Sequence, residues 1–192
     1  MISRLHLTAI IGIAVGSIAI TRLVAGESVS WGWFTSIGIA VAVNMVVITA
    51  FNHWIWRLRL WQGWFVNRPH LWGQWKVEIF SHWEDPETLK RPATISADLL
   101  IKQTYIAIHA RLQTNESRGD LISARLVESG DGRFRLTGIY RNEPNLDARE
   151  SSEIHYGAFI LDIEGDRNKP TSLTGHYWTD RQTTGRMTAV RP

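Results

Sequence analysis

The chain has 192 residues and no cysteine, which excludes a disulfide framework and a cysteine-ligated metal site. Its length suits one soluble domain of ordinary size together with a small membrane anchor. The formal net charge is +3, but residues 1–68 hold five arginines and one acid, whereas residues 69–192 are close to neutral. We therefore expect membrane lipids as a partner and expect neither DNA nor RNA.

Two long apolar runs occupy the first 56 residues. No Asp, Glu, Lys or Arg occurs in residues 5–21 or 28–56. A spanning helix needs about 20 mostly apolar residues, so the pattern predicts transmembrane helices over 5–23 and 31–56, forming a transmembrane α-hairpin in a domain of residues 1–56. The alternative for the first run is a cleaved signal peptide. The second run follows within a few residues and favours the hairpin.

The basic residues around these runs predict their orientation. Before the first helix lies Arg4, after the second lie Arg57, Arg59 and Arg68, and the connecting loop has Arg22 offset by Glu27. Cytoplasmic flanks of membrane helices are enriched in Lys and Arg. The sequence therefore predicts a multi-pass protein with both termini in the cytoplasm.

Both predicted helices carry small residues at four-residue spacing, namely Gly12 and Gly16 in the first and Ser36 and Ala40 in the second. Small residues let helices approach closely in a bilayer. One interpretation is that the two helices of one chain pack together through these faces. The other is that helices of different protomers meet there, so these four residues are our candidates for homo-oligomerisation.

Residues 57–70 mix arginine with leucine, tryptophan and phenylalanine up to Pro69, which ends any helix. This composition predicts a juxtamembrane interfacial linker. The pattern then changes to a period of two, and we predict a cytosolic domain over 71–192. The predicted strands are 72–83, 93–102, 104–113, 120–128, 133–142, 153–164, 172–180 and 183–190.

Eight short sequential strands with hairpin turns predict an all-β fold, an eight-stranded up-and-down minimal β-barrel. Ser129-Gly130-Asp131-Gly132 is a strong hairpin signal. Closure removes the exposed edges of an open sheet, and eight strands leave room for side chains or one small ligand. A β-sandwich is the alternative.

No catalytic or cofactor motif is present. The sequence contains no GxSxG elbow, no HxxxH or HExxH, and no Walker A or GxGxxG pattern. We therefore expect no enzymatic activity, no catalytic residue, no metal and no cofactor.

Two clusters near the end of the chain suit a nucleotide ligand. One surrounds the last hairpin, over residues 175–185, and the other ends the fifth predicted strand, over residues 139–143. Aromatic faces stack on bases, arginine pairs with phosphate, and Asn and Thr read base edges. The candidate ligand-binding residues are Tyr140, Arg141, Asn142, Tyr177, Thr179, Arg181 and Thr183. The alternative is that these residues are good strand formers around an ordinary turn.

The complete arrangement resembles a known family. The two-helix hairpin, the aromatic linker, LWGQW at residues 71–75, and YWTDR at 177–181 followed by Thr184-Gly185 are similar to the minimal β-barrel effectors of CBASS anti-phage defence, the CD-NTase-associated two-transmembrane β-strand-rich proteins. The resemblance covers essentially the whole chain.

This resemblance implies an antiviral effector of the bacterial inner membrane. Its barrel would bind a cyclic di- or oligonucleotide made by a partner CD-NTase, homo-oligomerise, and disrupt the membrane through its helices, causing cell death. The alternatives are a membrane-tethered, lipocalin-like barrel for a lipid or other hydrophobic ligand, and a membrane-anchored enzyme. A nucleotide receptor should line its interior with Arg, Thr, Asn and aromatic groups, whereas a lipid binder should line it with aliphatic groups alone.

Overall fold

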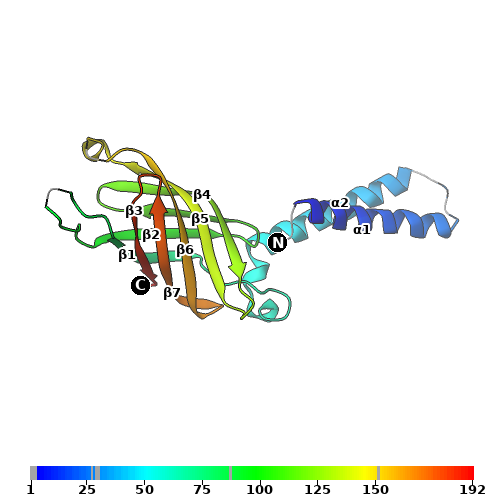
Figure 1. Ribbon diagram of the computed structural model, residues 1–192. Coiled ribbons are helices and arrows are strands. Elements are labelled where there is room, and N and C mark those ends of the chain that lie inside the picture. The colour runs from blue at the N-terminus through cyan, green and yellow to red at the C-terminus, as the bar shows by residue number, and fades with distance from the viewer. Residues whose placement is uncertain (1–3, 27, 29–30, 87, 151) are drawn as a thin grey trace. The chain divides into compact units, whose positions relative to one another are not determined.

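The computed structural model describes residues 4–26, 28, 31–86, 88–150 and 152–192 (Figure 1). The chain divides into two compact units, Met1–Leu58 and Arg59–Pro192. The first is helical. The second contains the barrel together with the residues that lead into its first strand.

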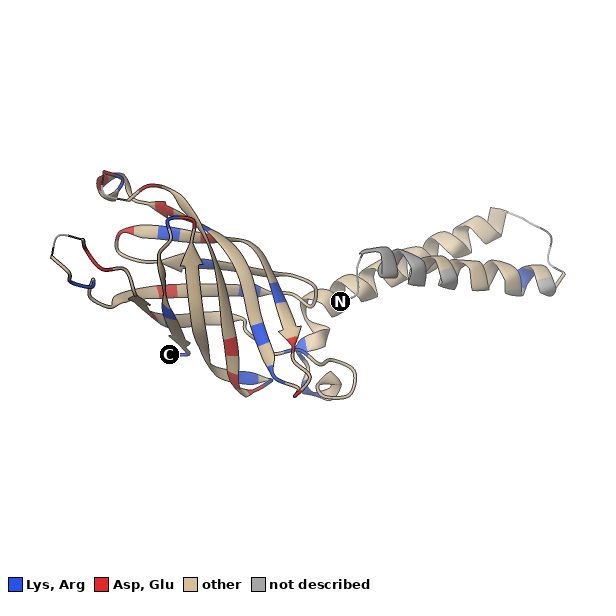
Figure 2. Cartoon of the chain, viewed as in Figure 1, with Lys and Arg blue, Asp and Glu red and all other residues tan. Residues whose placement is uncertain are grey.

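Two helices, α1 (Arg4–Val24) and α2 (Trp31–His53), make up most of the first unit, and a short 3-10 helix, η1 (Ile55–Arg57), follows them. Among the described residues, α2 is the helix that is long and apolar enough to cross a membrane. Figure 2 shows no charged residue along it, as its sequence requires. The first predicted span, residues 5–23, coincides in position with α1, and its role as a span remains a prediction.

The small residues of the two helices have different surroundings. Arg22 of α1 donates a hydrogen bond through Nη2 to Ser36 Oγ of α2 at 3.3 Å, so Ser36 faces the neighbouring helix of its own chain. Ala40 is half-buried. A Cβ atom added at Gly12 or Gly16 would meet no described atom within 4 Å. Among the described atoms, therefore, α2 makes no close contact with α1 at these two glycines.

Eight antiparallel strands form a closed barrel in chain order, so the prediction of an eight-stranded up-and-down barrel is confirmed (Figure 1). Closure is made by pairing between the first and last strands, with Val77 opposite Ala189, which excludes the sandwich alternative. The strands are β1 (Gly73–Ser81), β2 (Ile95–Gln103), β3 (Ile108–Gln113), β4 (Ser117–Glu128), β5 (Phe134–Pro144), β6 (His155–Asp166), β7 (Lys169–Thr179) and β8 (Thr184–Val190).

Two strand boundaries differ from the sequence prediction for a local reason. The third strand starts at Ile108 rather than 104, because Thr104 and Ala107 close a tight turn through a 2.8 Å backbone hydrogen bond. The fourth starts at Ser117 rather than 120, because Thr114 and Ser117 close another, at 2.9 Å. The connection between β2 and β3 is therefore longer than the sequence pattern predicted, and the connection between β3 and β4 is shorter.

Alternate side chains of each strand point inward and form the core. Apolar burial of this kind stabilises a fold by about 25 cal/mol per Å². The buried apolar residues include Leu71, Trp75, Val77, Ile101, Leu136, Leu161, Leu173 and Ala189.

The topology gives the barrel two different ends. Turns 104–107, 129–133 and 167–168 lie at the end where the chain enters β1, which we call the sealed end. Loops 82–94, 114–116, 145–154 and 180–183 lie at the opposite end, which we call the open end. The two predicted nucleotide clusters belong to the open end.

Candidate ligand-binding site

The sealed end is closed by the segment that precedes β1. Gln103, which is 1% exposed, accepts a hydrogen bond from the Leu71 amide through Oε1 at 2.7 Å and donates through Nε2 to the Pro69 carbonyl at 3.0 Å. The Trp75 indole donates to the Leu71 carbonyl at 3.0 Å. Buried backbone groups need hydrogen-bond partners. The Gln103 side chain supplies them to Pro69 and Leu71, as the backbone of a neighbouring strand would.

Arginine side chains complete the seal. The Arg191 guanidinium lies over the Trp75 ring, 4.7 Å from its centroid, and donates to the His70 carbonyl. Burial lowers the pKa of Arg191. Arg68 lies over the Tyr105 ring and donates to the Tyr105 carbonyl. Residues 66–71 are therefore held against the barrel wall by Arg68 from the segment itself and by Arg191 from the end of the chain.

A cavity of about 790 Å³ occupies the barrel at the open end. Ligand pockets for small molecules commonly have volumes of about 300–1,000 Å³. The inner part of the cavity is aliphatic and is continuous with the core. It is formed by Leu99, Ile101, Leu136, Leu161 and Met187.

The outer part of the cavity is polar and aromatic. Six of the seven residues that the sequence grouped as ligand-binding line it: Tyr140, Asn142, Tyr177, Thr179, Arg181 and Thr183. Arg141 lies apart from them on the outer face of β5, because Tyr140 and Asn142 point inward and the side chains of a strand alternate. The last hairpin and the end of β5, about 40 residues apart in sequence, thus contribute to one cavity.

Two tyrosine rings lie across glycines of the neighbouring strands. Tyr140 is paired with Gly157, and Tyr177 with Gly185. A Cβ atom at either glycine would overlap the ring of its partner. The glycines are therefore the reason that both rings can lie flat against the wall.

Phe159 extends this aromatic wall between the two tyrosines. Its ring stacks on Tyr140 with centroids 6.3 Å apart and an interplanar angle of 29°. Phe159 itself lies across Gly138, where an added Cβ would come within 2.7 Å of its ring. Flat aromatic surfaces of this type are used to stack nucleic acid bases.

The hydroxyl of Tyr140 is held in its protonated form. Burial raises the pKa of Tyr140 well above its usual range, the neighbouring Tyr177 and Asp180 raise it further, and Arg181 opposes them. At neutral pH the phenol is therefore a hydrogen-bond donor. Within the described part of the chain, neither Tyr140 nor Tyr177 makes a side-chain hydrogen bond to protein, which leaves both hydroxyls for a ligand.

The turn between β7 and β8 positions the charged group of the site. Thr179 and Thr183 face each other with their hydroxyl oxygens 2.6 Å apart. The Asp180 carboxylate accepts the Tyr156 amide at 3.0 Å and ties the turn to β6. Arg181 is exposed and donates to Ser152 Oγ at 3.1 Å. The guanidinium lines the cavity, and this is its hydrogen bond to the described part of the chain.

Several lining residues were not among the sequence candidates. Phe159 and His155 both come from β6, and the strand alternation that buries Leu161 was the available signal for them. His155 is buried, and its Nδ1 lies 2.9 Å from the Glu153 carbonyl. Ser81, the last residue of β1, and Trp83, in the loop that follows, carried no comparable signal because that loop is long.

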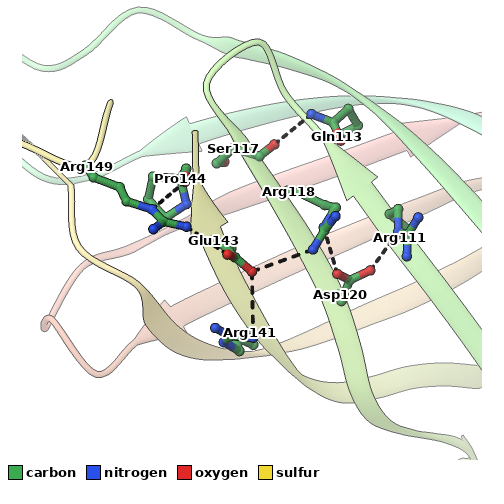
Figure 3. Close-up of polar contacts among 9 residues, drawn as sticks. All are labelled: Arg111, Gln113, Ser117, Arg118, Asp120, Arg141, Glu143, Pro144 and Arg149. Carbon is green, nitrogen blue, oxygen red and sulfur yellow. Dashed lines mark hydrogen bonds and ion pairs between the residues drawn. The ribbon is translucent and has the colours of Figure 1, made fainter. Parts of the chain in front are cut away.

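Arg141 belongs instead to an ion-pair network on the outer wall (Figure 3). It lies 3.7 Å from Glu143, which also pairs with Arg149 at 2.8 Å and with Arg118 at 3.6 Å. Asp120 continues the network to the Arg111 guanidinium at 2.7 Å, and this hydrogen bond lowers the pKa of Asp120. Because these charged groups are exposed to solvent, each ion pair contributes little to stability.

In the described residues no group of three or more His, Asp or Glu side chains is arranged to hold a metal ion. The arrangement that remains is a barrel sealed at one end and open at the other onto a cavity with an aliphatic floor, an aromatic wall and one arginine at its mouth. These features suit a small, planar, anionic ligand.

Comparison with known proteins gives the family. The family model "Cap15, cyclic dinucleotide receptor domain" matches residues 66–191, and the chain belongs to this family. A curated relative, CD-NTase-associated protein 15 of Staphylococcus schleiferi, is 24% identical over 154 residues, which cover 80% of this chain and 78% of the relative. The resemblance drawn from the sequence to a CBASS effector is thereby confirmed.

Proposed function

We propose that this chain is a receptor and effector of CBASS anti-phage defence that acts without catalysis. A cyclic dinucleotide made by a partner CD-NTase occupies the open-end cavity, and the protein then self-associates and disrupts the inner membrane. The single observation that carries the proposal is the cavity itself, where aromatic rings, hydroxyls, an amide and one arginine converge from four separate segments.

The lining favours a nucleotide over a lipid. A lipid-binding barrel would present aliphatic groups along the whole cavity, whereas here they form only the floor. Covering a polar group with an apolar ligand costs free energy when that group has no hydrogen-bond partner in the protein. The hydroxyls of Tyr140 and Tyr177 and the amide of Asn142 would each be left unpaired by a fatty chain.

Each lining group has a role that follows from its chemistry. Arg181 pairs with a phosphodiester through its planar fork. Tyr140 and Tyr177 provide stacking surfaces for the bases. Asn142, Thr179 and Thr183 hydrogen-bond base edges or sugar hydroxyls.

The membrane part of the proposal assigns both helices as spans, with both termini in the cytoplasm. Arg4 precedes the first helix and Arg57, Arg59 and Arg68 follow the second, consistent with the positive-inside rule. Gly12 and Gly16 support a contact between protomers, because no described atom of the single chain lies within 4 Å of a Cβ added at either position. A ligand moves such an equilibrium from mostly monomer to mostly oligomer by binding the assembled form about 5 kcal/mol more tightly.

Thermal unfolding of the full-length protein in detergent, with and without cyclic dinucleotides, tests the receptor assignment. Binding at 100 times Kd stabilises the folded state by about 2.7 kcal/mol, so the cognate ligand should raise Tm clearly. Linear dinucleotides and a fatty acid are the controls. A Tm increase with the fatty acid and none with any cyclic dinucleotide would contradict the proposal.

The assembly contact has a separate test. A Cβ atom at Gly12 or Gly16 meets no described atom within 4 Å, and neither residue belongs to the barrel, so replacing both with leucine should leave ligand binding unchanged. Dye leakage in cells that make the cyclic nucleotide should be lost. Killing at the parental rate would show that the glycine face is not the contact between protomers.

A further inference from the structure

His155 is a buried, titratable side chain of the cavity that has no role in the proposed function. It begins β6, where the inward positions His155, Gly157 and Phe159 alternate with outward ones. The side chain is 7% exposed, and the space onto which it opens is the cavity. Polar groups that are buried in this way normally have hydrogen-bond partners, so each ring nitrogen of His155 needs one.

The two ring nitrogens of His155 differ in their partners. Nδ1 lies 2.9 Å from the Glu153 carbonyl oxygen. A carbonyl oxygen only accepts, so Nδ1 carries a hydrogen. Nε2 makes no hydrogen bond to any residue that the structure describes. Neutral His155 therefore offers an acceptor at Nε2, whereas protonated His155 offers a donor there.

Asn142 and Arg181 lie on the two sides of His155 at the open end. Asn142 of β5 is paired with His155. On the other side, the Asp180 amide donates to the Tyr156 carbonyl at 2.9 Å. The next positions along these two segments, His155 and Arg181, are therefore neighbours, and both line the cavity together with Asn142. An amide, an imidazole and a guanidinium thus form a polar row along one wall.

The fixed charges of the cavity do not balance those of a cyclic dinucleotide. Such a ligand has two phosphodiesters and therefore two negative charges. Among the described residues that line the cavity, Arg181 and Glu116 carry a full charge at neutral pH, and their charges cancel. Tyr140 stays protonated, because burial raises its pKa. A charged group taken into a partly enclosed site is costly unless an opposite charge accompanies it, so the site needs a further cation.

We propose that His155 is the second cationic group of the site and takes up a proton when a cyclic dinucleotide binds. The proton comes from solvent and adds to Nε2, and the Nε2–H group then donates to a phosphodiester oxygen of the ligand. Imidazole is the side chain that changes charge near neutral pH, and an anion placed beside a titratable group favours its cationic form. The inference rests on the proposed function for the class of ligand.

Other titratable or charged groups lie on the elements around His155, but they keep their charge between about pH 6 and 8. Arg149 of the preceding loop is paired with Glu143 at 2.8 Å on the outer wall. A second histidine, His176, is exposed on the outer face of β7. The remaining groups at the open end are Glu116, Tyr140, Glu153, Tyr177, Asp180 and Arg181.

Calorimetric titration of the full-length protein in detergent measures proton uptake directly. The probe is the cyclic dinucleotide that raises Tm most, titrated at about pH 7.5 in phosphate and in Tris, two buffers with different ionisation enthalpies. The difference between the two heats gives the number of protons taken up, and we expect about one per bound ligand. Binding should be about tenfold weaker at pH 8 than at pH 7.

Two matched variants assign the proton to its residue. His155→Gln keeps a polar side chain that cannot take up a proton, so its affinity should be about tenfold below that of the parent at pH 7 and almost independent of pH. His176→Gln makes the same change on the outer face and should match the parent in affinity and proton uptake. Ligand-free Tm reports folding, and His155→Phe, which fills a similar volume, replaces His155→Gln if that variant does not fold.

Absence of proton uptake by the parent in a titration that shows binding would overturn the proposal, whatever the variants do. Equal proton uptake by the parent and by a folded variant of His155 would also overturn it. Either result leaves the receptor function standing, because binding itself is measured in the same titration. Failure of every cyclic dinucleotide to bind would instead contradict the proposed function, and the role of His155 with it.

Discussion

The sealed and open ends of the barrel are built from the same eight strands, but their buried polar groups differ in whether the protein itself supplies their hydrogen-bond partners. At the sealed end the amide of Gln103 is fully buried and both of its hydrogen bonds are made within the protein. At the open end the hydroxyls of Tyr140 and Tyr177 and the amide of Asn142 face a cavity. The sealed end therefore supplies stability, and the open end keeps its hydrogen-bonding groups for a ligand.

The largest effect is expected at the sealed end. Gln103→Ala removes both hydrogen bonds to the entering segment and leaves buried backbone groups at Pro69 and Leu71 without partners, so unfolding should become easier by about 2–4 kcal/mol. Denaturant unfolding followed by tryptophan fluorescence measures the change. Gln74→Ala, at an exposed position of β1, is the matched control and should be close to neutral.

Substitutions at the open end should lower ligand affinity more than they lower stability. Arg181→Ala removes a charge-assisted contact and should weaken cyclic dinucleotide binding about ten- to a hundredfold, with ligand-free Tm unchanged because Arg181 is exposed. Arg181→Lys should recover only part, since an ammonium lacks the fork. Calorimetric titration of Arg141→Ala, on the outer wall, should match the parent. An equal loss in both alanine variants would remove Arg181 from the site.

The aromatic wall gives a smaller effect with a sharp internal control. Gly157→Ala pushes the ring of Tyr140 away from the wall, so ligand affinity should fall several-fold and stability by about 1–3 kcal/mol. In a Tyr140→Ala background the same substitution should cost almost nothing, because no ring is left to displace. A double-mutant cycle measures this coupling. Additive effects would contradict the packing described for these two residues.

The smallest effect is a pH dependence. Because the pKa of Tyr140 is raised in the folded state, the unfolded chain loses this proton first as pH rises, and the folded state loses stability above about pH 10. Tyr140→Phe has no proton to lose, so its Tm should fall less steeply than that of the parent above this pH. If the Tm of the parent and of Tyr140→Phe fell in parallel with pH, the Tyr140 hydroxyl would not be shielded from solvent in the folded state.

The sequence was sufficient for the barrel and for much of the cavity, because both depend on local alternation. Period two in the strands determined which side chains point inward, and short turns determined their order. Alternation also separates Arg141 from Tyr140 and Asn142, a consequence that composition alone did not show. The contribution of Phe159 requires knowing that Gly138 lies beside it across the sheet, which is a matter of register.

Long-range contacts and β-bulges could not be predicted from the local sequence pattern. The hydrogen bonds of Gln103 join residues more than 30 positions apart, and nothing in the strand pattern distinguishes this glutamine from an ordinary strand end. Likewise the bulge beside Ile122 shifts which residues face outward only after β4 is paired with β5. The linker at residues 57–70 was predicted as interfacial, and its last residues also serve as the barrel seal.

Dye leakage from vesicles tests in one measurement whether a ligand in the cavity causes membrane disruption. Full-length protein reconstituted in dye-loaded vesicles is exposed to a cyclic dinucleotide that raises its Tm. We expect rapid leakage with the parent, leakage at much higher ligand concentration with Arg181→Ala, and parental leakage with Arg141→Ala. Leakage that is the same without nucleotide, or the same in Arg181→Ala as in the parent, would contradict the proposed function.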